Sequence, residues 1–206
     1  RAARGRGLGG ELLRAALAHG VALGVKELVA AIGTRNRAGS ALLAAYGFRP
    51  RRQHLLMRLD APPAAPRTGL RGVALAHATP DDAPAVLALH ALCGLDRRDP
   101  ADVEAAFSDR RRAVAVARHE GRVIGFAEIE RSWPPRPWVA WVGVEPALRD
   151  RGVGSALVAF ALAREFERGA HAALLLLPPG NPAAVRAYER IGFRRHRTVE
   201  VLERGL

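Results

Sequence analysis

The chain has 206 residues, of which 49% are hydrophobic and 25% charged, a balance that is typical of globular proteins and excludes disorder as the main state. Its net charge is +12, but Lys26 is the only lysine and the arginines are spread along the sequence. This distribution favours solvated arginine faces over a dedicated nucleic-acid site. The longest apolar run, residues 170–177, is far too short for a membrane helix.

Residues 1–60 are predicted to form two helices that alternate with two strands. The helices span Leu8–Leu23 and Asn36–Tyr46, and the strands span Glu27–Ile32 and Phe48–Leu59. A proline-rich stretch follows at residues 61–72 and is typical of a semi-rigid linker.

Residues 73–206 carry the signals of a complete domain. Thr79, with Pro80 behind it, caps a helix that ends near Leu92. Glu120 and Gly121 join two strands in a predicted hairpin. The predicted strands are Val73–Ala78, Ala113–Arg118, Arg122–Glu130, Trp138–Val144, Ala172–Leu177 and Phe193–Leu202, and the further helices are Pro100–Phe107, Gly154–Arg168 and Asn181–Ile191.

This order of elements predicts an α/β (α+β) fold. A long helix between two strands implies a crossover between parallel neighbours, whereas the hairpins before it imply antiparallel neighbours. We therefore expect a mixed, largely antiparallel sheet with one parallel pair and helices on its faces.

An internal repeat links the two parts of the chain. Arg4-Gly-Arg-Gly-Leu-Gly9 recurs as Arg149-Asp-Arg-Gly-Val-Gly154, at an offset of 145 residues. Asn36 recurs as Asn181, and Gly47-Phe-Arg49 as Gly192-Phe-Arg194, both at the same offset. We therefore expect residues 1–60 to be the C-terminal half of a first copy and residues 73–206 to be a complete second copy. Because no initiator Met is present, we expect the first copy to lack its N-terminal part.

The turn at residues 149–154 has the chemistry of a phosphate site. Glycines allow positive φ and a close approach of the backbone to a ligand. The first amides of the helix that follows have no partner within the helix, and together with the helix dipole they favour an anion. Arg149 and Arg151 add positive charge. Pyrophosphate is the ligand that we expect.

Two motifs resemble the GNAT superfamily of acetyl-CoA-dependent N-acyltransferases. The first is Val142-Gly-Val-x-Pro-x-Leu-Arg149-x-x-Gly152-x-Gly154-x-x-Leu157, and the second is Asn181-x-x-Ala184-x-x-x-Tyr188-x-x-x-Gly192-Phe193. With the order of elements, the resemblance covers residues 73–206. It implies that the parallel strand pair is splayed, and the duplicated layout resembles the tandem members of the superfamily.

The resemblance implies a binding site for acetyl-CoA as co-substrate. Backbone amides of residues 150–155 would hold the pyrophosphate, and the strand that carries Val142 and Val144 would pair with the pantetheine arm. Asn181 is either a cofactor contact or a helix N-cap. The predicted cofactor-binding residues are Val142, Val144, Arg149, Asp150, Arg151, Gly152, Val153, Gly154, Ser155 and Asn181.

Two residues are candidates for proton transfer. The resemblance gives Tyr188 the role of the general acid that protonates the departing thiolate; the alternative is a buried tyrosine with a backbone partner. The first copy has Leu43 at this position and cannot use the same route. An attacking ammonium must lose a proton to a base or a water chain. Glu128 and Glu130 share one face of a strand and either could serve, with Glu128 as the candidate base; the alternative is that they are ordinary exposed carboxylates of a strand. Histidine spacing and the single Cys93 predict no metal site.

The predicted function is direct transfer of an acetyl group from acetyl-CoA to a primary amine of a small molecule or peptide in a ternary complex. One alternative is a non-catalytic acyl-CoA-binding or interaction module with the same fold. Another is a nucleic-acid binder that depends on the arginines. We expect a cytoplasmic protein without a membrane segment. The sequence leaves open whether the protein forms a homo-oligomer.

Overall fold

The computed structural model describes residues 7–64, 68–95, 98–133 and 135–206. The chain divides into two compact units, each described separately below. The smaller unit combines the residues up to Leu56 with His196–Leu206, and the larger unit spans Met57–Arg195. The division into residues 1–60, 61–72 and 73–206 stays a prediction, and residues 65–67 of the expected linker lie outside the described residues.

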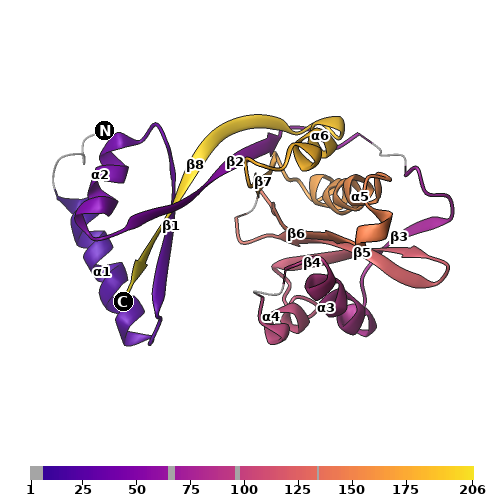
Figure 1. Cartoon of the computed structure of the whole chain (residues 1–206), viewed down its shortest axis with the longest axis horizontal. Coiled ribbons are helices and arrows are strands. Elements are labelled where there is room, and N and C mark those ends of the chain that lie inside the picture. The colour runs from indigo at the N-terminus through magenta and orange to yellow at the C-terminus, as the bar shows by residue number, and fades with distance from the viewer. Residues whose placement is uncertain (1–6, 65–67, 96–97, 134) are drawn as a thin grey trace. The chain divides into compact units, whose positions relative to one another are not determined.

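The smaller unit is built from two helices and three strands (Figure 1). In it, β8 lies between β1 and β2 and pairs antiparallel with β1. Leu17, Phe48 and Leu202 form its buried core. The last strand of the chain, β8, therefore pairs with the first, β1. The elements are α1 (Leu8–Ala22), β1 (Glu27–Gly33), α2 (Arg37–Ala45), β2 (Arg49–Leu59) and β8 (Arg194–Gly205).

The larger unit contains a mixed sheet in the order β7-β6-β5-β4-β3. Neighbours from β3 to β6 are antiparallel, and β6 and β7 are parallel. This confirms the expected sheet with one parallel pair and flanking helices. The strands are β3 (Val73–His77), β4 (Arg112–His119), β5 (Arg122–Glu130), β6 (Trp138–Val144) and β7 (Ala173–Leu177), and the helices are α3 (Ala83–Leu92), α4 (Pro100–Ala105), α5 (Val153–Glu167) and α6 (Pro182–Arg190), with 3-10 turns at Pro80–Asp82 and Pro146–Leu148.

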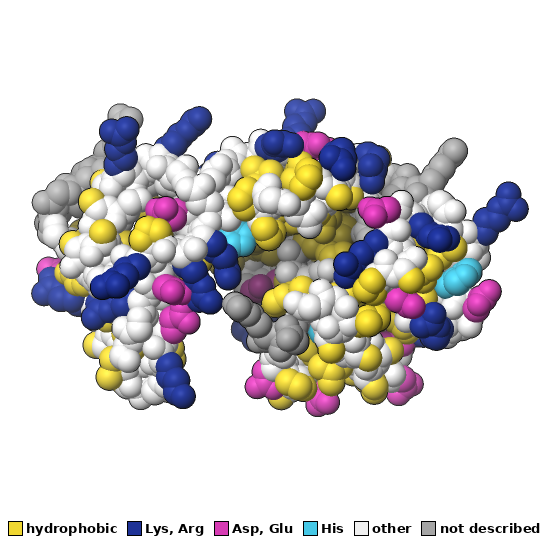
Figure 2. Space-filling model, viewed as in Figure 1, with side chains coloured by type: hydrophobic (Ala, Val, Ile, Leu, Met, Phe, Trp, Pro, Cys, Tyr) yellow, Lys and Arg dark blue, Asp and Glu magenta, His cyan; other side chains and the backbone are white. Residues whose placement is uncertain are grey.

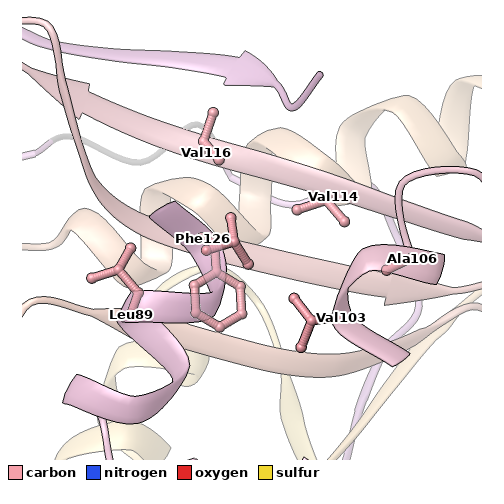
Figure 3. Close-up of a cluster of buried hydrophobic side chains, with 7 residues drawn as sticks. Leu89, Val103, Ala106, Val114, Val116 and Phe126 are labelled. Carbon is pink, nitrogen blue, oxygen red and sulfur yellow. The ribbon is translucent and has the colours of Figure 1, made fainter. Parts of the chain in front are cut away.

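Helices cover both faces of this sheet, with α3 and α4 on one side and α5 on the other (Figure 1). Residues 124–129 of β5 are all buried, as expected for a strand between two helical layers. Figure 3 shows Phe126 of β5 facing Leu89 of α3 and Val103 of α4. This apolar layer holds α3 and α4 against the sheet.

Strands β6 and β7 pair over a very short distance. Their register contains two residue pairs within the described chain, Trp138 with Leu174 and Val139 with Leu175. Residues 140–144 of β6 continue without a β7 partner in this register. The two strands therefore separate toward their carboxyl ends, and the backbone of β6 becomes available there.

Basic side chains show no concentration on one element of the visible surface. Figure 2 shows Lys and Arg distributed among acidic and apolar side chains. Many of the arginines form ion pairs, such as Arg51 with Glu203 and Arg122 with Glu145. This arrangement agrees with solvated arginine faces.

Candidate active site

One cavity of about 460 Å³ in the larger unit gathers most of the predicted site residues. It is lined by β6, the turn before α5, helix α6 and the end of α3. Tyr188 lines this cavity. So do nine predicted cofactor-binding residues, namely Val142, Val144, Arg149, Asp150, Gly152, Val153, Gly154, Ser155 and Asn181. Cofactor binding by these residues stays a prediction.

The turn that opens α5 leaves backbone amides without a partner inside the helix. Gly152 is the N-cap with φ of 79°, and Asp150 also has a positive φ of 61°. The first bond of the helix runs from the Ala156 amide to the Gly152 carbonyl, at 3.0 Å. The amides of residues 153–155 therefore have no partner inside the helix. They lie at the positive end of the dipole of a 15-residue helix, an arrangement that favours an anion.

Packing brings this turn against strand β6. A Cβ built on Gly154 would lie 3.5 Å from Cγ2 of Val144 and 3.8 Å from Cγ1 of Val142. The Arg149 Nε donates a hydrogen bond of 3.2 Å to the Val144 carbonyl. The Arg151 side chain does not line the cavity, and its carbonyl accepts a hydrogen bond from the Gly69 amide at 2.8 Å.

Asn181 caps helix α6, which is one of the two roles predicted for it. Its Oδ1 accepts a hydrogen bond of 3.0 Å from the Ala184 amide at the start of α6. The residue also lines the cavity. The cap and a cofactor contact are therefore compatible roles.

Tyr188 is placed on the inner face of α6. Its ring lies edge-on to Phe193, with 5.8 Å between the ring centroids. Burial raises the pKa of the Tyr188 hydroxyl to about 12, so the phenol keeps its proton at neutral pH. Within the described residues, no protein atom accepts a hydrogen bond from this hydroxyl. The side chain is thus available as a proton donor to a molecule in the cavity.

Glu128 lies outside this cavity. It lines a separate hollow of about 390 Å³ together with Trp141 and Arg112, and only 3% of the residue is exposed. Its Oε2 accepts a hydrogen bond of 2.5 Å from Nη1 of Arg98, and its Oε1 accepts one of 2.7 Å from Nε of Arg112. Burial raises the pKa of the Glu128 carboxyl, and the hydrogen bond and charge of Arg98 oppose this shift.

Several residues that line the cavity or lie beside the hollow were not among the predicted site residues. Cys93, at the end of α3, lines the cavity and places its Sγ 3.3 Å from the Val144 carbonyl. Ala184 and Ala187 also line the cavity. Ala184 lies four residues before Tyr188 on the same helix face and is part of the second motif, so the sequence indicated it, whereas Ala187 had no such signal. Arg98 had none either.

The turn before α1 in the smaller unit differs from the turn before α5. Gly7 has φ of 78°, close to that of Gly152, from which it is separated by the repeat offset. A Cβ on Gly9 would lie 3.1 Å from Cδ2 of Leu42, and one on Gly10 would lie 2.8 Å from the Tyr46 hydroxyl. Leu42 and Tyr46 therefore lie close to Gly9 and Gly10, whereas Gly7 has open space around it.

Among the residues that the structure describes, no group of three or more His, Cys, Asp or Glu side chains is arranged to hold a metal ion. None of the helices described is long and apolar enough to cross a membrane.

The sequence pattern of the Acetyltransferase (GNAT) family matches residues 68–193. The chain belongs to this family and is an acetyl-CoA-dependent N-acetyltransferase, which confirms the predicted enzyme class. A protein of Thermobispora bispora named mycothiol acetyltransferase is 33% identical over 219 residues, covering 98% of this chain and 72% of its own length. One of the same name from Mycobacterium avium is 34% identical, covering 93% and 67%.

Solved structures show the same fold. A tandem GNAT protein from the clavulanic acid biosynthesis pathway superimposes with a TM-score of 0.70 at 17% identity, covering 98% of this chain and 71% of its own. At this identity the likeness concerns the fold alone.

Proposed function

We propose that the chain transfers an acetyl group from acetyl-CoA to a primary amine by direct attack within a ternary complex. The observation that carries the proposal is the single cavity in which the glycine turn of α5, the free carboxyl end of β6 and Tyr188 meet. The turn supplies an anion site, β6 supplies backbone groups that can hydrogen-bond to the cofactor, and Tyr188 supplies a proton donor.

The cofactor is proposed to extend from the turn along β6. The amides of residues 153–155 would bind its pyrophosphate, and Arg149 would add charge nearby. The backbone of β6 beyond Val139 has no β7 partner in the observed register. Apart from the Val144 carbonyl, which Arg149 and Cys93 already contact, it is available to pair with the amide groups of the pantetheine arm. Oriented backbone donors of this kind account for a large part of the rate of acyl transfer.

The chemistry balances with two proton transfers. The amine nitrogen attacks the thioester carbonyl carbon, so a C–N bond forms and the C–S bond breaks. The Tyr188 phenol, which is protonated at neutral pH, gives its proton to the departing thiolate. The proton of the amine passes to a base, which we assign to Glu128 either directly or through water.

We propose a mycothiol-related amine as the acceptor, since the relatives described above are named mycothiol acetyltransferase. A cytoplasmic location and a homo-oligomer stay predictions, as does the use of a peptide amine instead of a small molecule. A panel of primary amines that includes mycothiol-related compounds tests the acceptor class.

We also propose that the chain contains a duplication, with residues 1–60 as part of a first copy. Helix, strand, helix and strand follow one another in α1-β1-α2-β2 as they do in α5-β7-α6-β8. Three pairs of glycines with positive φ recur at the offset of 145, namely Gly7 and Gly152, Gly24 and Gly169, and Gly47 and Gly192. Asn36 caps α2 as Asn181 caps α6. These matches support the repeat.

Tyr188→Phe tests the catalytic proposal, with Tyr46→Phe as the matched control at the only other tyrosine. The Tyr188 variant is expected to bind acetyl-CoA as the unchanged chain does and to lose turnover by about 10²-fold or more, as is typical of a missing general acid. Equal turnover in the two variants would contradict the role. Binding without turnover in the unchanged chain, across the amine panel, would support the non-catalytic alternative.

A further inference from the structure

Four charged side chains form a closed ring beside the hollow that Glu128 lines. Arg98 binds Glu128 and Asp102, with an Nη1–Oε2 distance of 2.5 Å and an Nε–Oδ2 distance of 2.6 Å. Arg112 binds the same two carboxylates, with 2.7 Å from Nε to Oε1 of Glu128 and 2.7 Å from Nη1 to Oδ1 of Asp102. The two positive and two negative charges alternate around the ring.

The ring has a buried side and an exposed side. The side chains of Arg98 and Glu128 are 3% and 4% exposed, whereas that of Arg112 is 13% exposed and that of Asp102 is 51% exposed. Arg98 also donates from Nη2 to Oε1 of Glu128, at 3.2 Å. The pair of Arg98 and Glu128 is thus the fixed inner part, and it is bidentate.

Neighbours from three further positions hold Arg98 in place. Its guanidinium lies 5.4 Å from the ring centroid of Trp141 on β6. Its Nη1 is 3.4 Å from Nε2 of His90 on α3, and its Nη2 donates to the Asp102 carbonyl at 3.3 Å. Because these contacts come from α3, α4 and β6, Arg98 has one well-determined position. A carboxylate bound to it is therefore fixed as well.

We propose that Arg98 is a positioning residue of the acetyl transfer: it fixes the Glu128 carboxylate toward the hollow and keeps it ionised, so that the carboxylate can accept the proton of the amine. The inference rests on the proposed function, in which Glu128 is the base. Arg112 is less suited to this task, because its side chain is more exposed than that of Arg98 and it contacts only Oε1 of Glu128.

The charges around Glu128 determine in which direction its pKa changes when Arg98 is removed. Burial, Asp102 on α4 and Glu130 on β5 all raise the pKa of Glu128, and Arg98 lowers it. Arg112 on β4 binds it directly, and His90 on α3 reaches it through Arg98. Loss of Arg98 should therefore leave Glu128 protonated up to a higher pH. A protonated carboxyl accepts no proton, so the acidic limb of the activity profile should move upward.

Arg98→Gln in the full chain tests the inference, with Arg131→Gln as the matched control. Arg131 forms a comparable bidentate pair with the buried Glu165, with distances of 2.8 Å and 2.5 Å. The carboxyl carbon of Glu128 is titrated by NMR in ¹³C-glutamate-labelled protein and assigned with Glu128→Gln. We expect the midpoint to rise by about one pH unit in the Arg98 variant, and to stay unchanged in the Arg131 variant.

Kinetics supply the second readout. Loss of Arg98 should lower kcat/KM for the best amine of the panel about tenfold, leave the Kd for acetyl-CoA unchanged, and shift the acidic limb in parallel with the NMR midpoint. The amine titrates identically in every variant, so a difference in the limb belongs to the protein. If Arg98→Gln does not fold, Arg98→Lys carries the test, with a smaller shift in the same direction.

The outcomes separate the two claims. An unmoved midpoint and an unmoved limb overturn the role of Arg98 while the proposed acetyl transfer stands. If Glu128→Gln keeps the full rate and the acidic limb, Glu128 is not the base and the inference fails with it, although Tyr188 and the cofactor cavity are unaffected.

Discussion

The buried imidazole of His90 should make the larger unit sensitive to acid. Only 2% of this residue is exposed, and its ring lies 4.5 Å from that of Phe126 and 5.5 Å from that of Trp141, between centroids. Burial lowers the pKa of His90 from 6.5 to about 4, and the nearby Arg98 acts in the same direction. The native state therefore stays neutral at this position while the unfolded chain takes up a proton.

The sign and size of the effect follow from linkage. Below pH 6.5 the unfolded state binds one proton more than the native state, so the free energy of unfolding falls with falling pH. The loss ends near pH 4, where the native imidazole also becomes protonated. One pKa unit corresponds to about 1.4 kcal/mol. The free energy of unfolding should therefore fall by roughly 3 kcal/mol over the whole range from pH 6.5 to 4, and by about 2–3 kcal/mol between pH 6.5 and 4.5.

Urea unfolding of His90→Gln at pH 6.5 and 4.5 measures this contribution. Fluorescence of Trp133, Trp138 and Trp141 is the probe, since all three tryptophans belong to the larger unit. The unchanged chain should lose about 2–3 kcal/mol more than the variant between the two values of pH. His171→Gln, which removes an exposed imidazole, should behave as the unchanged chain does. Equal losses in the chain with and without His90 would refute the reasoning.

Two further predictions concern the sheet and the proton donor. A Cβ on Gly143 would lie 2.4 Å from Cε1 of Phe126, so Gly143→Ala should destabilise the larger unit by about 1–3 kcal/mol in urea unfolding. Gly180→Ala, with open space around it, should not share this loss, and equal midpoints would contradict the packing argument. Since burial raises the pKa of Tyr188 to about 12, kcat should not fall between pH 8 and 10. A decline with an apparent pKa near 10 would count against Tyr188 as the donor.

Local patterns in the sequence were sufficient to predict the elements of the larger unit. The strands at Arg122–Glu130 and Trp138–Val144 have the predicted bounds. The helix cap predicted at Thr79 is present as a capping box, in which Asp82 accepts a hydrogen bond of 2.9 Å from the Thr79 amide. These features depend on residues that are close in the sequence, so periodicity and cap chemistry reveal them.

The same local patterns could not predict which strands and side chains pair when they lie far apart in the sequence. The sequence indicates a strand at Phe193–Leu202 but contains no sign that this strand joins β1 in the smaller unit, extending to Gly205. Nor does it show that Arg98 pairs with Glu128 on another element. Alternation in a strand reports which faces are buried, whereas the choice of neighbour depends on tertiary packing.

The candidate site was predictable where one short segment builds it. The turn at residues 149–154 and the cap at Asn181 are local, and the structure places both at one cavity. Cys93 enters the same cavity from α3, and no local signal distinguishes it from a core residue. Its position depends on how α3 packs against β6, where its thiol reaches the Val144 carbonyl.

Calorimetric titration of acetyl-CoA into the chain and into Gly152→Val tests the central claim most directly. Gly7→Val is the matched control, because it imposes a similar strain at φ of 78° in the corresponding turn before α1, which does not line the cofactor cavity. The account predicts one molecule of acetyl-CoA per chain, binding lost in the Gly152 variant and binding retained in the Gly7 variant. Unchanged binding in the Gly152 variant, or loss of binding only in the Gly7 variant, would contradict the assignment of the cofactor to the turn before α5.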